Sequence, residues 1–326
     1  MTIISAIRLN MNGLADPAQN HADRYRAALA MAAFADQHGF SIINLEEHHC
    51  AQNGWLPSPL TMAGAVIGAT STIKVNVTAL LVTLYDPIRL AEDIAVLDLM
   101  SGGRFNFVAG LGYRPEEYHA MDKDWARRGQ LMDIAIDTLL KAWADEPFEH
   151  RGQLVNVTPK PLSKPHPFFF IGGMSKAAAR RAARFGVPFY PPMAMPELEA
   201  LYYQELKKHG NEGFVYYPNQ GNAMHFIHPE PEQAWQDFGP YFLNEAREYA
   251  SWRREGVPRP SEEHTETVEE LREQKRFEIF TPEQCLNRIE DGMNTVVIHP
   301  LVGGLPLEHG WNCLRLLQEQ VLAKLA

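Results

Sequence analysis

The chain has 326 residues, 45% hydrophobic and 21% charged, which is typical of a folded globular protein and argues against a disordered one. A net charge of -10, with no basic cluster clear of acidic neighbours, argues against nucleic-acid binding. The three cysteines are far apart and form no CxxC pair, so the sequence indicates neither a disulfide framework nor a thiolate metal site.

The first residues alternate apolar and polar side chains, which predicts a strand over residues 3–9 and not a secretory signal. Apolar runs elsewhere stay well short of the roughly 18 residues that would cross a bilayer. We therefore expect a cytoplasmic protein with no membrane association.

Short β-branched runs alternate with longer segments of helical periodicity, a pattern typical of parallel strands covered by helices. Strands are expected at 3–9, 41–45, 74–81, 105–109, 168–171, 222–227 and 295–299. Helices are expected at 21–38, 59–70, from 87 to the turn at 101–103, and at 125–143, 175–185, 198–208 and 307–325. We interpret residues 1–326 as a single α/β domain, a (β/α)8 TIM barrel, whose count of eight strands is inferred.

Two stretches depart from this rhythm. Residues 188–195 are rich in proline and are interpreted as a connection. Residues 247–276 are dense in Glu and Arg, with little apolar periodicity, and are interpreted as an insertion or lid-like excursion. A solvated helix coated with surface ion pairs is the alternative for the second stretch.

Four titratable residues, Glu46, Glu47, His48 and His49, follow the second predicted strand directly. Reactive groups of α/β barrels lie at the carboxyl ends of strands, so we expect this segment at the mouth of the barrel. His48 could act as a general acid or base, with a neighbouring carboxylate fixing its tautomer. Alternatively, only half of these residues face the site, because neighbours on an extended chain point to opposite sides. Adjacent histidines rarely bind one metal together, so no metal site is predicted.

Glycine-rich loops follow two further strands. Gly110 and Gly112 come after the fourth strand, where the lack of a Cβ lets a ligand lie against the backbone. Gly172 and Gly173 precede a helix that begins near Ser175, and free backbone amides at a helix N-terminus favour a phosphate. The first loop could instead serve only to turn the chain, and Ser175 in the second could be an ordinary N-cap.

Several motifs resemble those of the luciferase-like flavin oxidoreductases in residue identity, order and spacing. The resemblance covers nearly the whole chain apart from 247–276. It is carried by residues 45–49, 57–59, 86–93, 98–105 and 172–175, and by 280–284, 296–300 and 303–306 near the carboxyl terminus.

This resemblance implies a barrel that binds reduced FMN at its mouth and oxygenates a small organic substrate with dioxygen through a flavin C4a-peroxide. It implies a general acid/base role for His48 and an orienting role for Glu47. A non-proline cis peptide is expected near Thr78 and Ala79. The residues expected to contact the cofactor are Thr78, Ala79, Gly110, Gly112, Arg114, Gly172, Gly173, Met174 and Ser175.

Luciferases carry an arginine for the flavin phosphate where this chain has Leu111, so Arg114 is the expected substitute. This departure argues against light emission without affecting flavin binding. The resemblance also implies a homodimer. A separate flavin reductase is expected, because no GxGxxG nicotinamide fingerprint follows a predicted strand.

Three other functions stay open. A deazaflavin-dependent dehydrogenase or reductase could use the same barrel, although its relatives often have Asp-His in place of Glu-His-His. A non-catalytic flavin-binding protein would be expected to have lost the acid and base residues. A metal-dependent barrel hydrolase would need His and Asp ligands on several strand ends, with His48 or His49 and His225 or His299 as the starting pairs.

Overall fold

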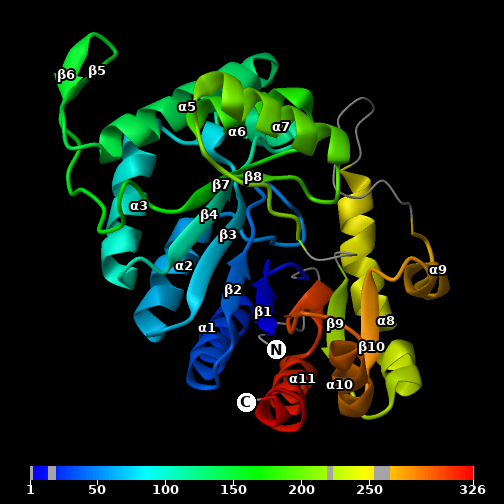
Figure 1. Cartoon of the computed structure of the whole chain (residues 1–326). Coiled ribbons are helices and arrows are strands. Elements are labelled where there is room, and N and C mark those ends of the chain that lie inside the picture. The colour runs from blue at the N-terminus through cyan, green and yellow to red at the C-terminus, as the bar shows by residue number, and fades with distance from the viewer. Residues whose placement is uncertain (1–2, 14–19, 219–222, 253–264, 326) are drawn as a thin grey trace. The chain divides into compact units, whose positions relative to one another are not determined.

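The computed structural model of the chain describes residues 3–13, 20–218, 223–252 and 265–325 (Figure 1). The chain divides into two compact units. We call Ser58–Pro218 the central unit, and Met1–Pro57 with Asn219–Val257 and Ser261–Ala326 the terminal unit.

The described part of the terminal unit contains five parallel strands in the order β10-β9-β11-β1-β2. The strands are β1 (Ile4–Leu9), β2 (Ile42–Leu45), β9 (Met224–Ile227), β10 (Phe277–Phe280) and β11 (Thr295–Ile298). The helices are α1 (His21–Gln37), α8 (Pro231–Ser251), α9 (Val268–Glu273), α10 (Pro282–Glu290) and α11 (Leu307–Gln320), with short 3-10 turns η3 (Val302–Gly304) and η4 (Leu322–Lys324). This sheet therefore joins both ends of the chain, because β1 pairs directly with β11.

The central unit contains four parallel strands in the order β3-β4-β7-β8 and a separate antiparallel hairpin, β5–β6. The strands are β3 (Lys74–Leu80), β4 (Phe105–Ala109), β5 (Phe148–His150), β6 (Gln153–Val155), β7 (Phe169–Gly172) and β8 (Phe189–Tyr190). The helices are α2 (Pro59–Ala69), α3 (Pro87–Ser101), α4 (Pro115–Ala120), α5 (Arg128–Trp143), α6 (Lys176–Phe185) and α7 (Pro196–His209), with turns η1 (Val82–Leu84) and η2 (Trp125–Arg127). The hairpin follows α5 and projects away from the sheet (Figure 1).

Local chemistry explains where the helices begin and end. The Asp86 carboxylate accepts hydrogen bonds from the first amides of α3, and Pro87 occupies the position where a missing N–H costs nothing. Gly102 ends the same helix with φ of 63°, in the left-handed region that favours glycine. Asp86, Pro87 and Gly102 thus set the two ends of α3.

The α/β class predicted from the sequence is confirmed, with parallel strands in both units. Closure into an eight-stranded barrel and the single-domain organisation stay predictions. The stretch 188–195, interpreted as a connection, contains the short strand β8. The sequence analysis also missed the hairpin β5–β6, strand β10 and most of α8.

The proposed insertion, 247–276, lies only partly within the described residues. Its first residues complete α8, and α9 lies near its other end. Residues 253–264 lie outside the described part of the chain. The insertion therefore stays a prediction. In the described part of the chain, no helix combines the length and the apolar character needed to cross a membrane.

Candidate functional site

In the terminal unit, the Glu46–His49 segment leaves the end of β2 and is held against neighbouring backbone. The His48 amide donates to the carbonyl of Leu56 at 3.1 Å, and the Leu56 amide donates to the carbonyl of Asn10 at 2.8 Å. The side chains of Glu47 and His48 are 2% and 5% exposed. The loop after β2 is therefore fixed to the end of β1, which places these groups at the carboxyl edge of the sheet.

Glu47 pairs with the second histidine of the motif. Its Oε1 lies 3.0 Å from Nε2 of His49, and both side chains are buried. The carboxylate expected to orient His48 thus also holds the neighbouring imidazole. The orienting role of Glu47 toward His48 stays a prediction.

Three aromatic side chains surround the ring of His48. Its centroid lies 5.4 Å from that of Trp55, 6.2 Å from Tyr249 and 4.5 Å from Trp252. Trp55 contacts both of the other rings, at 4.9 and 5.1 Å. We call these three residues the aromatic cover of His48. An imidazole in such surroundings is shielded from bulk water, which suits chemistry that must exclude stray protons.

A buried ion-pair network lies beside this cover on α8. Glu245 Oε1 accepts from Nη1 of Arg8 at 2.6 Å, and Oε2 lies 3.0 Å from Nδ2 of Asn12 and 3.1 Å from Nδ1 of His299. Arg8 also pairs with Glu46, where its Nη2 donates at 3.0 Å. Burial alone would raise the pKa of Glu245, but the charges of Arg8 and His299 outweigh it and hold that pKa well below its ordinary value.

This network connects the predicted motif to helix α8. Glu245 and Tyr249 are four residues apart on one face of α8, and Trp252 follows as the C-cap of that helix. Arg8 joins that face to Glu46, the first residue of the Glu46–His49 segment. The sequence analysis missed Arg8, Glu245, Tyr249 and Trp252, because their roles depend on contacts between distant segments.

In the central unit, the strands β3, β4 and β7 are parallel neighbours, so the loops at their carboxyl ends meet at one edge. The expected non-proline cis peptide is confirmed between Thr78 and Ala79. Gly110 lies directly against it, since a Cβ on Gly110 would come within 2.8 Å of the Ala79 Cβ. Only a glycine fits this position without a shift of the backbone.

The glycine loop after β4 is held by a tyrosine. The Tyr118 hydroxyl donates to the carbonyl of Leu111 at 2.6 Å and lies 2.6 Å from the Thr83 hydroxyl. Gly112 has φ of 73°, and the Leu81 side chain lies against it. The loop is therefore supported by η1 and α4.

Arg114, the expected phosphate ligand, lies in a buried ion pair. Its Nη1 donates to Glu117 at 3.2 Å, and the two side chains are 9% and 0% exposed. A guanidinium already paired with a buried carboxylate can contact an anion only with its remaining N–H groups. The phosphate role of Arg114 stays a prediction.

The second glycine loop leads into α6. The Ser175 hydroxyl accepts a hydrogen bond from the amide of Ala178 at 3.2 Å. Ser175 is therefore the N-cap of α6, as the alternative interpretation of the sequence expected. Gly173 has φ of 147°, and a Cβ there would meet the Cβ of Ala178 at 2.7 Å. The loop thus packs closely on the first turn of α6, whose first amides and dipole still favour an anion.

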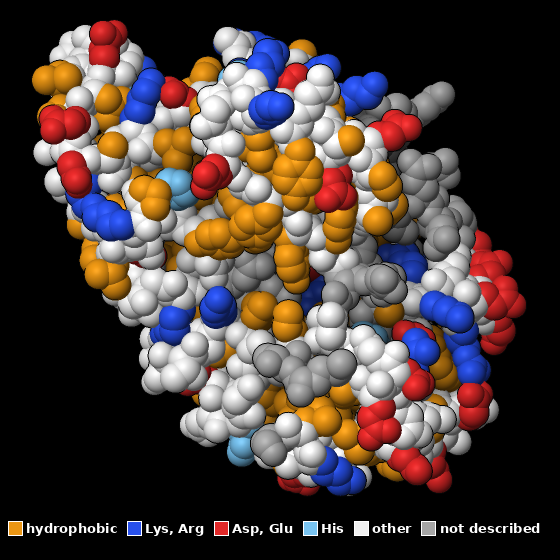
Figure 2. Space-filling model, in the orientation of Figure 1, with side chains coloured by type: hydrophobic (Ala, Val, Ile, Leu, Met, Phe, Trp, Pro, Cys, Tyr) orange, Lys and Arg blue, Asp and Glu red, His pale blue; other side chains and the backbone are white. Residues whose placement is uncertain are grey.

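An aromatic cluster that the sequence analysis missed lies beside this loop. Phe170 contacts Tyr190, Phe214 and Tyr216 at centroid distances of 5.4, 5.9 and 5.8 Å. Burial raises the pKa of Tyr190 well above its ordinary value, so its hydroxyl stays neutral. Phe214 and Tyr216 are more than a third exposed, and Figure 2 shows hydrophobic side chains gathered over this part of the central unit.

The predicted site residues fall into two groups. Glu47 and His48 belong to the terminal unit, and Thr78, Ala79, Gly110, Gly112, Arg114, Gly172, Gly173, Met174 and Ser175 belong to the central unit. Within each unit, the predicted residues lie at the carboxyl edge of the sheet. Among the described residues, no group of three or more His, Cys, Asp or Glu side chains could hold a metal ion.

Comparison with known proteins identifies the family. Residues 7–299 match the family of luciferase-like monooxygenases. The chain belongs to that family. The alkanal monooxygenase beta chain of Vibrio harveyi is 26% identical over 56% of this chain and 59% of its own length. This chain spans about half the length of the first curated relatives that it matches.

Solved structures share the fold at low sequence identity. Monooxygenase RslO1 of Streptomyces bottropensis superposes with a TM-score of 0.78 at 21% identity, over 99% of this chain and all of its own. The oxygenating constituent of 3,6-diketocamphane monooxygenase of Pseudomonas putida, solved with FMN, gives a TM-score of 0.71 at 16% identity over 99% of each chain. The luciferase-like fold predicted from the sequence is confirmed.

Proposed function

We propose that this luciferase-like protein is a flavin-dependent monooxygenase that uses reduced FMN and dioxygen to oxygenate a small organic substrate through a flavin C4a-peroxide. A cytoplasmic location, a homodimer and a separate flavin reductase are parts of this proposal. The family membership and the activities of the relatives support it.

The observation that carries the proposal is the edge of the central unit where the loops after β4 and β7 lie side by side. Both loops are rich in glycine, and the second opens onto the N-terminus of α6. This combination fits a phosphate-bearing ligand with a flat ring system, because backbone amides can bind the phosphate while the glycines leave room beside the chain. When bound there, reduced FMN would supply the activation of dioxygen.

The residues of this chain have separate roles in the proposal. Residues 110–112 and 172–175 hold the cofactor, with the first turn of α6 at its phosphate. His48 holds or moves a proton at its imidazole, and the aromatic cover limits the access of water to that ring. Arg8 and Glu245 fix the segment on which His48 lies.

The test is an anaerobic titration of the purified protein with reduced FMN, followed by mixing with aerated buffer in a stopped-flow spectrometer. A long-lived oxygen adduct of the bound flavin is the expected result. A His48→Asn variant should bind reduced FMN as tightly and should change the decay of the adduct, since the imidazole is lost while the cofactor loops are untouched. Reoxidation at the rate of free reduced FMN would contradict the proposal.

The same titration with reduced deazaflavin distinguishes the monooxygenase from the main alternative, a deazaflavin-dependent enzyme. Tight deazaflavin binding without an oxygen adduct would identify a hydride-transferring dehydrogenase or reductase. Flavin binding without any effect on its reaction with oxygen would identify a non-catalytic flavin-binding protein. Rapid oxidation of NADH by the purified chain alone would contradict the need for a separate reductase.

A further inference from the structure

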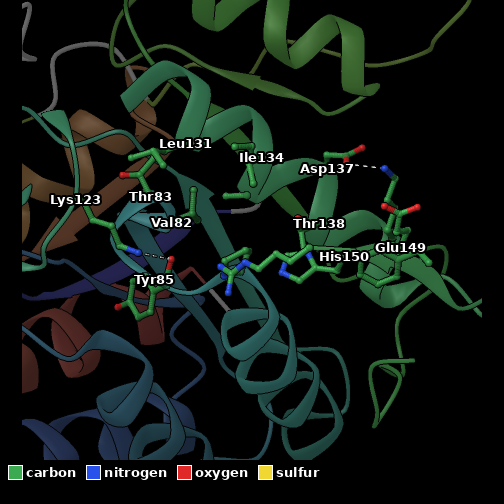
Figure 3. A pocket seen from close by; sticks show the side chains of 15 residues that line it. Val82, Thr83, Tyr85, Lys123, Leu131, Ile134, Asp137, Thr138, Glu149 and His150 are labelled. Carbon is green, nitrogen blue, oxygen red and sulfur yellow. Dashed lines mark hydrogen bonds and ion pairs between the residues drawn. The ribbon is translucent and has the colours of Figure 1, made fainter. Parts of the chain in front are cut away.

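A cavity of about 410 Å³ lies in the central unit, away from the glycine loops (Figure 3). Its walls come from η1, the start of α3, α5 and the hairpin β5–β6. Volumes of roughly 300 to 1,000 Å³ are typical of sites for small organic ligands. The residues that form its apolar side include Val82, Leu131, Ile134, Ala135 and Phe148.

Three cations also line this cavity, and they are not equivalent. Lys141 pairs with Asp137 at 2.7 Å, and Arg151 pairs with Asp86 at 2.8 Å. Lys123 has no carboxylate partner within the described ranges, and its ammonium group lies 3.4 Å from the carbonyl of Tyr85 (Figure 3).

His150 adds a polar group whose Nε2 is buried and has no hydrogen-bond partner among the described residues. Its imidazole lies on the cavity wall, on the same side of α5 as Thr138 (Figure 3).

The cavity is linked to the first glycine loop through η1. Thr83 lies on the cavity wall, and its hydroxyl is 2.6 Å from the Tyr118 hydroxyl. Tyr118 donates in turn to the carbonyl of Leu111, inside the glycine loop. Leu81 and Leu84, which flank Thr83, pack with Tyr118 in one buried cluster, so a ligand that restrains η1 also restrains the support of the loop.

We propose that this cavity binds an organic carboxylate with an aryl or short aliphatic body, and that its occupancy orders the glycine loop at residues 110–112 through Thr83 and Tyr118. The carboxylate accepts a hydrogen bond from Lys123, and the body lies against the apolar side. The role of residues 110–112 as a cofactor loop rests on the proposed function, whereas the cavity and its link to that loop do not.

The binding test uses 2-naphthoate and its neutral counterpart, 2-naphthamide, with the full-length protein in a calorimetric titration. A charge-assisted hydrogen bond contributes about 1.5–3 kcal/mol, so Lys123→Met should lower the affinity for 2-naphthoate at least about tenfold. The same variant should change 2-naphthamide binding far less. Lys164→Met is the matched control, since Lys164 lies outside the cavity and pairs with Asp145.

The coupling test measures amide hydrogen exchange of residues 109–114 with and without 2-naphthoate, in the absence of any flavin. We expect slower exchange in the wild type. In Tyr118→Phe, 2-naphthoate should still bind while this protection is lost, because the hydroxyl that joins Thr83 to Leu111 is absent. Thr83→Val provides a second break in the same link, and a thermal unfolding scan shows that each variant is folded.

Failure of 2-naphthoate to bind at millimolar concentration, or equal weakening by Lys123→Met and Lys164→Met, would overturn the carboxylate site. Binding without any change in loop exchange would overturn the coupling. Because no flavin is present, these outcomes are independent of whether the chain is a monooxygenase.

Discussion

The indole of Trp252 lies over the imidazole of His48, with 4.5 Å between the ring centroids. Trp252 directly follows α8, and His48 follows β2, so two distant segments of the terminal unit meet at this contact. The group proposed to move a proton is therefore covered by a side chain from another element.

We predict that Trp252→Ala makes His48 more reactive toward diethylpyrocarbonate. Removal of the indole uncovers a ring that is 5% exposed, so modification should be several-fold faster. Mass spectrometry of the peptide that contains His48 measures the rate. Trp311→Ala is the control, because Trp311 packs on Phe34 and not on His48. Equal rates in the two variants would show that Trp252 does not limit access.

Glu245→Gln should destabilise the protein strongly. The substitution removes the negative charge that partners the buried Arg8, and the loss of one member of a buried pair costs about 3–5 kcal/mol. Urea unfolding at neutral pH measures the change. Asp23→Asn breaks the exposed pair with Arg26 and should cost about 1 kcal/mol or less. Similar losses for both variants would mean that the network contributes no more than a surface pair.

His225 should make stability fall in mild acid. Burial, aided by the charge of Arg288, lowers the pKa of this imidazole from 6.5 to about 4. Between those values the unfolded chain binds the proton first, so stability is unaffected above about pH 6.5 and declines as the pH falls toward 4. At pH 5 the loss should be about 2 kcal/mol.

Urea unfolding at pH 7 and pH 5 checks this prediction. In His225→Asn, an amide oxygen can still accept from the Val297 amide, and the extra loss at pH 5 should disappear. His119→Asn alters an exposed imidazole at the end of α4 and should leave the loss intact. An unchanged pH dependence in His225→Asn would assign the acid sensitivity to other groups.

Gly110→Ala should weaken the binding of reduced FMN and lower stability by about 1–3 kcal/mol, because the new Cβ would lie 2.8 Å from Ala79. Gly68→Ala is the matched control. Nothing lies within 4 Å of a Cβ at Gly68, and alanine favours a helix by about 1 kcal/mol, so this variant should be as stable as the wild type or more so. Flavin titration and thermal unfolding measure both effects. Equal stability and equal flavin affinity of the two variants would show that a Cβ at residue 110 does not clash with Ala79.

Strands and helices with a long local pattern could be predicted from the sequence. The segment 105–109 is a buried β-branched and aromatic run that forms β4 as expected, and Pro87 to Gly102 carries its own start and stop signals. Strand β8 has only two residues between prolines, which is too short for any period to emerge. Helix α8 contains Gly239 and Pro240 in its interior, and these residues normally interrupt a helix.

The position of the Glu46–His49 segment at a strand end could also be predicted, because that depends only on local order along the chain. The partners of this segment could not. Arg8 and Glu245 are separated by 237 residues, and no local pattern indicates that two such residues meet. The pairing of Arg114 with Glu117 depends on burial, which the spacing of the residues does not reveal.

The pairing of β1 with β11 has a consequence for the order in which the protein folds. The central unit is formed by one nearly continuous segment, so it can complete its contacts while the rest of the chain is still being synthesised. The terminal unit needs residues from both ends. Until residue 245 leaves the ribosome, Arg8 lacks its buried partner. Strand β1 likewise cannot pair with β11 until the last part of the chain has been synthesised. Slow, late assembly of the terminal unit follows from this topology, since contacts between distant segments must close a long loop.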